Sequence, residues 1–188
     1  MTWSIGFRAP TWQHLLQDLS DSVAEKLNNS QRYSDSRLKL QDNPAEISAD
    51  SLKKVRKKLH DLMHLNDTAF ANWFGTAVSQ QACELPIFTQ EEVNADTLKE
   101  QFSTGRVLML SPYVRLSYVR GSNGFQVYIN GEHCHINSPL IPFICQQRCI
   151  EIDDGVNLSN ENTLIDWLCD GYTKGYWVWQ DELLEDDE

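Results

Sequence analysis

The chain has 188 residues, of which 27 are Asp or Glu and 16 are Lys or Arg, so its formal net charge is −11 and its length accommodates one or two small domains. No uninterrupted apolar run approaches the roughly 20 residues that a membrane-spanning helix needs, and the first ten residues lack the basic start and apolar core of a secretion signal. We therefore expect a cytoplasmic protein with no membrane association.

The first predicted element is a strand, Trp3-Ser4-Ile5-Gly6-Phe7-Arg8, with no neighbouring strand before a long helical stretch begins. A lone strand leaves its backbone donors and acceptors unpaired. We therefore expect residues 1–9 to be one strand of a sheet that precedes them, and the chain to be the back half of something longer.

Residues 10–83 carry three apolar stripes at the three- and four-residue spacing of amphipathic helices. A start signal precedes each stripe: Pro10 or Thr11 for the first, Ser48 for the second and Asp67 for the third. The pattern predicts three helices that form a small bundle.

Such a bundle has a thin core, because roughly 70 residues bury little apolar surface. An exposed apolar side would favour self-association, and we predict a homodimer through the stripes. The alternative, in which every stripe residue is core of a monomeric bundle, stays open. The residues assigned to the dimer interface are Leu15, Leu19, Val23, Leu52, Val55, Leu59, Leu62, Phe70, Trp73 and Phe74.

Charge divides the chain into two parts. Residues 1–83 hold 10 Lys or Arg against 9 Asp or Glu, and residues 84–188 hold 6 against 18, which gives +1 and −12. Six of those acids lie in residues 181–188, a run that is typical of a solvated tail. The asymmetry indicates two domains with different surfaces.

Residues 84–180 change from helical to alternating periodicity. Asn130-Gly131 is the strongest short hairpin signal, and Gly121-Ser122-Asn123-Gly124 joins an earlier pair of strands. This succession is typical of a winged-helix-like α+β domain. The predicted elements are a helix over about 94–102, strands over 114–118, 125–129 and 132–136, a helix from Ser138-Pro139, a helix near 160–172, and a strand over 176–179.

Five segments carry a family resemblance. They are Ser4-Ile5-Gly6-Phe7-Arg8-Ala9-Pro10, Arg32-Tyr33-Ser34-Asp35, Phe70-Ala71-Asn72-Trp73-Phe74-Gly75, Ile129-Asn130-Gly131-Glu132 and Gly171-Tyr172-Thr173-Lys174-Gly175-Tyr176-Trp177. In this order they resemble the C-terminal half of bacterial JmjC/cupin ribosomal oxygenases. The resemblance implies the last strand of an absent cupin barrel (1–9), a helical dimerisation domain (10–83), a winged-helix-like domain (84–180) and an acidic tail (181–188).

The resemblance also implies a parent enzyme that uses Fe(II) and 2-oxoglutarate to hydroxylate an arginine of a basic, large-subunit ribosomal protein. Iron in that family is held by an HxD pair and a later His. No HxD occurs in this chain, and the resemblance places all three ligands before residue 1. We therefore assign no catalytic, metal or cofactor residue and expect the chain as given to be inactive. The alternative is a stand-alone winged-helix interaction or adaptor protein.

His133-Cys134-His135, with Cys145 and Cys149, suggests zinc, because imidazole and thiolate are the preferred ligands of that ion. In a strand, however, Cys134 points away from both histidines. The five cysteines are an odd number without CxxC spacing, so free, mostly buried thiols are the favoured interpretation.

A basic cluster, Lys53, Lys54, Arg56, Lys57 and Lys58, lies opposite the leucines of the second helix. It could contact nucleic acid, and a solvated helix face explains it equally well. The helix near 160–172 carries acids and no Lys or Arg. We therefore expect no DNA binding by the winged-helix-like domain.

Overall fold

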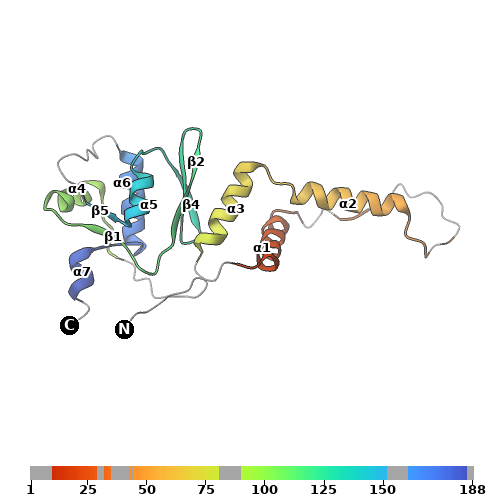
Figure 1. Cartoon of the computed structure of the whole chain (residues 1–188), viewed down its shortest axis with the longest axis horizontal. Coiled ribbons are helices and arrows are strands. Elements are labelled where there is room, and N and C mark those ends of the chain that lie inside the picture. The colour runs from red at the N-terminus through yellow and green to blue at the C-terminus, as the bar shows by residue number, and fades with distance from the viewer. Residues whose placement is uncertain are drawn as a thin grey trace. The chain divides into compact units, whose positions relative to one another are not determined.

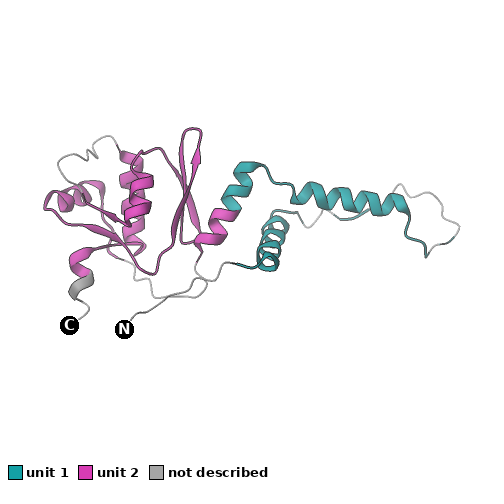
Figure 2. Cartoon of the chain, viewed as in Figure 1, with its two compact units in different colours: residues 1–73 teal, residues 74–188 magenta. Residues whose placement is uncertain are grey.

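The structure is a computed structural model (Figure 1) that describes residues 10–28, 32–34, 43, 45–80, 90–151 and 161–185. Of residues 183–185 it describes the backbone. The predicted strand over residues 1–9 and the predicted boundary between residues 83 and 84 lie outside these ranges. The chain forms two compact units, residues 1–73 and 74–188 (Figure 2). Among the described helices, none is both long enough and apolar enough to span a bilayer.

Unit 1 contains α1 (Trp12–Glu25), α2 (Ala49–Met63) and the first part of α3 (Asp67–Ser79). The predicted start signals Thr11 and Ser48 are confirmed, whereas α3 begins at the predicted Asp67 but is capped by the preceding Asn66. The side chain of Thr11 accepts a hydrogen bond from the backbone N–H of His14, and the side chain of Ser48 accepts one from Ser51. Before α3, the side chain of Asn66 accepts from the N–H of Ala69 at 2.8 Å.

The interior of unit 1 is small. Among its described residues, Val23 and Trp73 are the buried ones, each 9% exposed. α1 packs against α2, and Trp73 Nε1 on α3 donates to Asp18 Oδ2 on α1 at 2.7 Å. Several large apolar side chains of these helices therefore remain in contact with solvent.

Unit 2 contains the predicted antiparallel meander of β2 (Leu116–Gly121), β3 (Gly124–Ile129) and β4 (Glu132–Ile136). Asn130 and Gly131 have φ angles of 48° and 86°, the left-handed values that a tight Asn-Gly hairpin turn requires. β2 begins later than the predicted residue 114, because the N–H of Val114 bonds back to Ser111 in a turn.

A second antiparallel sheet has the order β5–β1–β6, formed by β1 (Leu108–Leu110), β5 (Cys149–Ile150) and β6 (Trp177–Trp179). The closing strand was predicted, whereas β1 and β5 were missed. β6 starts one residue later than predicted, because the N–H of Tyr176 closes the end of the preceding helix on the carbonyl of Gly171.

The helices of unit 2 are α4 (Ala95–Ser103), α5 (Ile141–Gln147), α6 (Asn162–Thr173) and α7 (Gln180–Glu185). Two expectations were wrong. α5 begins at Ile141, because Ser138 Oγ instead accepts from the N–H of Leu140 in the preceding turn. The expected solvated tail starts as helix α7, which Arg106 holds by ion pairs described below.

One continuous core joins both sheets with α4, α5 and α6, and its fully buried members include Leu98, Leu108, Ile141, Leu168 and Trp177. α6 packs against α4 and β6, and α5 packs against β2 and β5. The predicted α+β class, helices followed by a domain of mixed helix and sheet, is confirmed.

The second half of α3 docks on the meander. A Cβ at Gly75 would lie 2.5 Å from ring atoms of Tyr128 on β3, so the absence of a side chain permits the contact. At the end of α3, the buried Ser79 Oγ accepts from the N–H of Gly131 at 3.1 Å. Residues 74–79 therefore belong to unit 2.

Candidate functional site

The described residues provide no group of three or more His, Cys, Asp or Glu side chains that could hold a metal ion. On β4, His133 and His135 are exposed, whereas Cys134 is partly buried and packs against the core. This confirms the predicted alternation along the strand. The described residues therefore form neither the zinc site that was considered nor an iron site.

The most distinctive surface is the apolar stripe of α2, which consists of Leu52, Val55, Leu59 and Leu62. At about 100° per residue these four positions fall within an arc of about 80°. Leu52 is 56% exposed, Val55 37% and Leu59 58%, and no residue of α2 is buried. The amphipathic helix thus presents its apolar side to solvent within one chain.

The other residues predicted for a dimer interface divide into two groups. Leu15 and Leu19 on α1 are half-buried, and Val23 and Trp73 are buried already within one chain. Phe70 and Phe74 on α3 are 48% and 41% exposed. Sequence spacing identified the stripes, but it could not separate positions that one chain covers from positions that it leaves open.

Two further apolar residues of α1 are exposed and were not assigned to the interface. Trp12 is 87% exposed and Leu16 is 59% exposed. Both were visible in the helical spacing of the first stripe. Large exposed apolar side chains that gather on neighbouring helices mark interaction surfaces in soluble proteins.

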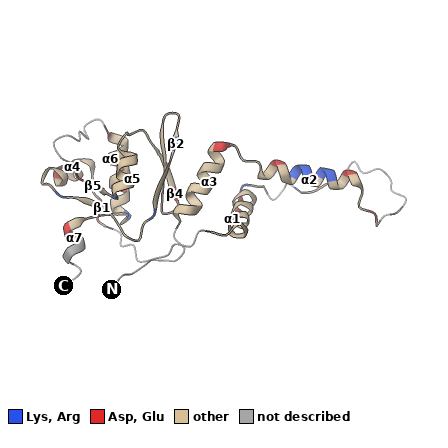
Figure 3. Cartoon of the chain, in the orientation of Figure 1, with Lys and Arg blue, Asp and Glu red and all other residues tan. Residues whose placement is uncertain are grey.

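The opposite face of α2 is cationic, and we call Lys53, Lys54, Arg56, Lys57 and Lys58 the basic face. All five side chains are exposed. Figure 3 shows them as a run of blue in the middle of the helix, with red at its two ends. Lys54 Nζ donates to the carbonyl of Ser34 and lies 5.3 Å from the ring centroid of Tyr33.

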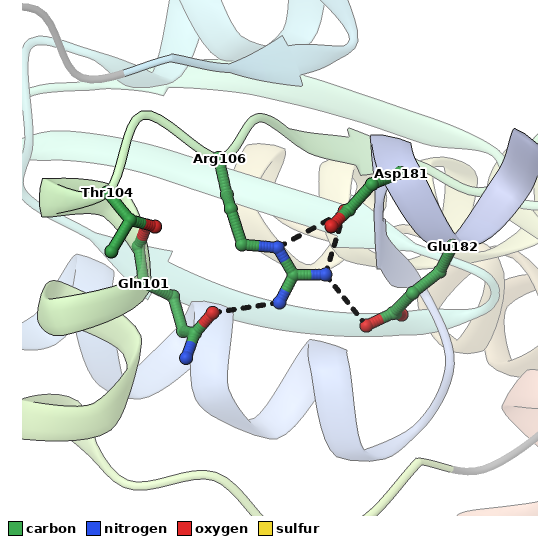
Figure 4. A network of polar contacts seen from close by, with 5 residues as sticks. All are labelled: Gln101, Thr104, Arg106, Asp181 and Glu182. Carbon is green, nitrogen blue, oxygen red and sulfur yellow. Dashed lines mark hydrogen bonds and ion pairs between the residues drawn. The ribbon is translucent and has the colours of Figure 1, made fainter.

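In unit 2, Arg106 connects α4 with α7 (Figure 4). Its guanidinium donates to Asp181 Oδ1 at 2.7 and 3.1 Å, to Glu182 Oε1 at 3.0 Å and to Gln101 Oε1 at 2.8 Å. It also lies 4.6 Å from the ring centroid of Trp179. The hydrogen bond from Arg106 holds the pKa of Asp181 below its ordinary value.

A second polar network ties α6 to the meander. Lys174 Nζ donates to Glu132 Oε2 at 2.6 Å and lies 2.9 Å from Asp170 Oδ2, and Tyr176 Oη donates to Glu132 Oε1 at 3.1 Å. Burial opposes the charge on Lys174, but the two carboxylates outweigh it and raise its pKa. Sequence reasoning missed both networks, because Arg106 lies 75 residues from Asp181 and Lys174 lies 42 residues from Glu132 in the chain.

The four described cysteines are free and partly buried. Burial raises the pKa of Cys134 and of Cys145 to about 11 each. Nearby Asp170 and Glu132 add to the effect at Cys134. The thiols of Cys134 and Cys145 are therefore protonated at neutral pH, which does not suit a nucleophile.

The sequence pattern of the ROXA-like winged-helix family matches residues 56–178. The ribosomal protein uL16 3-hydroxylase of Escherichia coli (strain K12) is 24% identical over 182 residues, which cover 96% of this chain and 48% of that protein. The chain thus spans about half the length of this curated relative.

Solved structures agree with these matches. The crystal structure of the Escherichia coli ribosomal oxygenase YcfD superposes with a TM-score of 0.73 at 25% identity, covering 94% of this chain and 48% of that one. YcfD in complex with cobalt and 2-oxoglutarate gives a TM-score of 0.72 with the same identity and coverage. The predicted winged-helix domain and the resemblance to half of a ribosomal oxygenase are confirmed.

Proposed function

Because the chain belongs to the ROXA-like winged-helix family, we propose that it is the dimerisation and winged-helix portion of a ribosomal oxygenase that depends on Fe(II) and 2-oxoglutarate. The complete enzyme would hydroxylate an arginine of a large-subunit ribosomal protein in the cytoplasm. Support comes from the relative named as a uL16 hydroxylase and from its structural counterpart that holds cobalt, a stand-in for iron, with 2-oxoglutarate.

In this proposal the portion described here is not catalytic. Its described residues offer no ligand set for iron, so the iron would be bound in the half of the enzyme that this chain does not match. The chain's own contribution is to hold two copies together and to present the winged-helix domain beside the catalytic part.

One observation carries the dimer proposal: α2 is amphipathic, yet it buries no residue within one chain. Full burial of a Leu or Val side chain contributes about 1.5–3 kcal/mol. Four such side chains in one stripe, repeated on a second copy, provide a substantial driving force for pairing. A self-complementary surface of this kind is typical of two-fold symmetric dimers.

Substitution Leu59→Glu tests the proposed dimer, because it places a charge in the middle of the stripe, where burial without a partner is strongly unfavourable. We expect light scattering to give the mass of a dimer for the wild type at micromolar concentration and of a monomer for the variant. Phe143→Glu is the matched control, since Phe143 is 53% exposed on α5 in unit 2 and should leave the dimer intact. A wild-type monomer would refute the dimer.

The purified chain, supplied with Fe(II), 2-oxoglutarate and uL16, tests the assignment of a non-catalytic portion. We expect mass spectrometry to show no added oxygen atom on the ribosomal protein. Hydroxylation by this chain alone would contradict the proposal.

The DNA sequence beside the coding region distinguishes the proposed enzyme from the alternative, a stand-alone adaptor. An adjoining sequence that encodes an HxD-containing barrel would favour the enzyme.

A further inference from the structure

The basic face of α2 is dense and separate from the apolar stripe. At about 100° per residue its five positions cover an arc of about 200°, and the stripe occupies the remaining side of the helix. The five cations less Asp50 and Asp61 leave α2 with a charge of +3, on a chain whose net charge is −11. α2 is therefore a local positive surface on an acidic protein.

The five cations of the basic face have no acidic partner among the residues that the structure describes. Within the part of the chain that the structure describes, none of them forms an ion pair, whereas Arg106 and Lys174 in unit 2 each pair with two carboxylates. Asp61 could in principle pair with Lys57 or Lys58 at helical spacing. Its Oδ1 instead lies 3.6 Å from Nδ1 of His60. The charge of the basic face is thus available to an external anion.

We propose that the basic face of α2 binds RNA through its phosphates. Four of its five cations are lysines, compact charges that bind phosphate without the planar, two-pronged geometry of arginine. Tyr33 is the ring that Lys54 contacts, with Nζ 5.3 Å from the ring centroid, and stacking on an aromatic ring does not discriminate between bases. The binding is therefore independent of base sequence.

The choice of RNA rests on the proposed function, because a ribosomal protein substrate is encountered together with ribosomal RNA. An anionic membrane could also attract a basic amphipathic helix, but membrane binding requires the apolar side of that helix to enter the lipid. In the proposed dimer the apolar stripe is covered by the partner copy. The basic face points away from that interface and stays accessible on each copy.

The test measures fluorescence anisotropy of a labelled single-stranded RNA of about 20 nucleotides against the full chain at several KCl concentrations. Five phosphate contacts predict that affinity falls about 100-fold between about 50 and 200 mM salt. Substitution of Lys53, Lys57 and Lys58 by Gln leaves two contacts, and the fall should shrink to about 7-fold with weaker binding at the lowest salt. Lys54 is kept because it contacts Ser34.

The matched control carries Lys26→Gln, Lys99→Gln and Arg120→Gln, the same change in charge at positions outside α2, and should bind like the wild type. Light scattering of each sample reports the dimer separately, so lost RNA binding with an intact dimer concerns this inference alone. Wild-type affinity and salt dependence in the triple variant of α2 would overturn it. Failure of the wild type to bind RNA, or binding to phosphatidylglycerol vesicles without binding to RNA, would overturn it too.

Discussion

Gly75 shows how a single residue attaches a helix to a sheet. An added methyl group would meet the ring of Tyr128 at 2.5 Å, and Tyr128 is fully buried, so the ring has little room to move. Neither its apolar neighbours nor its spacing distinguish this glycine in the sequence, because the close approach exists only after α3 has packed on β3. The periodicity of a sequence therefore does not predict which glycines make such contacts.

Substitution Gly75→Ala is expected to destabilise the protein by about 1–3 kcal/mol, the usual range for overpacking in a tight core. Urea denaturation followed by tryptophan fluorescence measures the change. Gly121→Ala is the matched control, because its Cβ would meet Gly124 O at an ordinary 3.5 Å and its backbone is not left-handed. Equal stability of the two variants would show that the packing of α3 on Tyr128 is not as tight as described.

At the scale of elements, periodicity predicted long helices and alternating strands well. The meander and its Asn-Gly turn were found because alternation and turn chemistry agree over residues 116–136. β1 and β5 were missed because strands of three and two residues are too short to show a period, and neither carries the aromatic residues that marked the equally short β6. They form because β1 pairs with β6 on one side and with β5 on the other, which is a tertiary effect.

The start of α7 illustrates the same limit. Acidic residues after Trp179 were interpreted as a solvated tail, because a run of like charge repels itself. Arg106 reverses that outcome by pairing with Asp181 and Glu182, 75 and 76 residues away in the chain. No local pattern contains this information.

The stabilising effect of the ion pair that holds α7 should therefore depend on pH. The hydrogen bond from Arg106 lowers the pKa of Asp181 below its ordinary 3.8, so its stabilisation is complete above that value and is lost as pH falls through the lower folded-state pKa. The pair is largely exposed, and we expect it to contribute at most about 1 kcal/mol. The stability difference between wild type and Asp181→Asn, measured by urea denaturation from pH 6 to about 2.5, should decrease towards the acid end. A difference that stays constant with pH would contradict the ion pair.

At the scale of the whole molecule, charge is distributed unevenly, and the positions of the charged residues in the sequence were enough to predict this. Residues 84–188 hold 18 acids against 6 basic residues, and acids on α4 and α6, such as Asp96, Glu100 and Asp166, are exposed. A negative surface raises the local concentration of a cationic partner. This suits the basic ribosomal protein of the proposed function.

Neutralising Asp96, Glu100 and Asp166 to Asn, Gln and Asn should weaken the binding of a basic ribosomal protein fragment at low salt and have little effect at high salt, where the field is screened. Isothermal titration at two ionic strengths measures this. Asp21→Asn, Glu25→Gln and Glu46→Gln form the control, with the same change in charge in unit 1. Equal losses in both variants would show that net charge, rather than its location in unit 2, determines binding.

The partly buried thiols of unit 2 have a practical consequence. The pKa values of Cys134 and Cys145 are raised to about 11. Iodoacetamide at neutral pH should therefore react slowly with both thiols in the native protein, and it should alkylate them once local unfolding exposes them. The rate at which each peptide acquires the adduct would then time the opening of the meander and of α5 independently, with no dye or tag introduced.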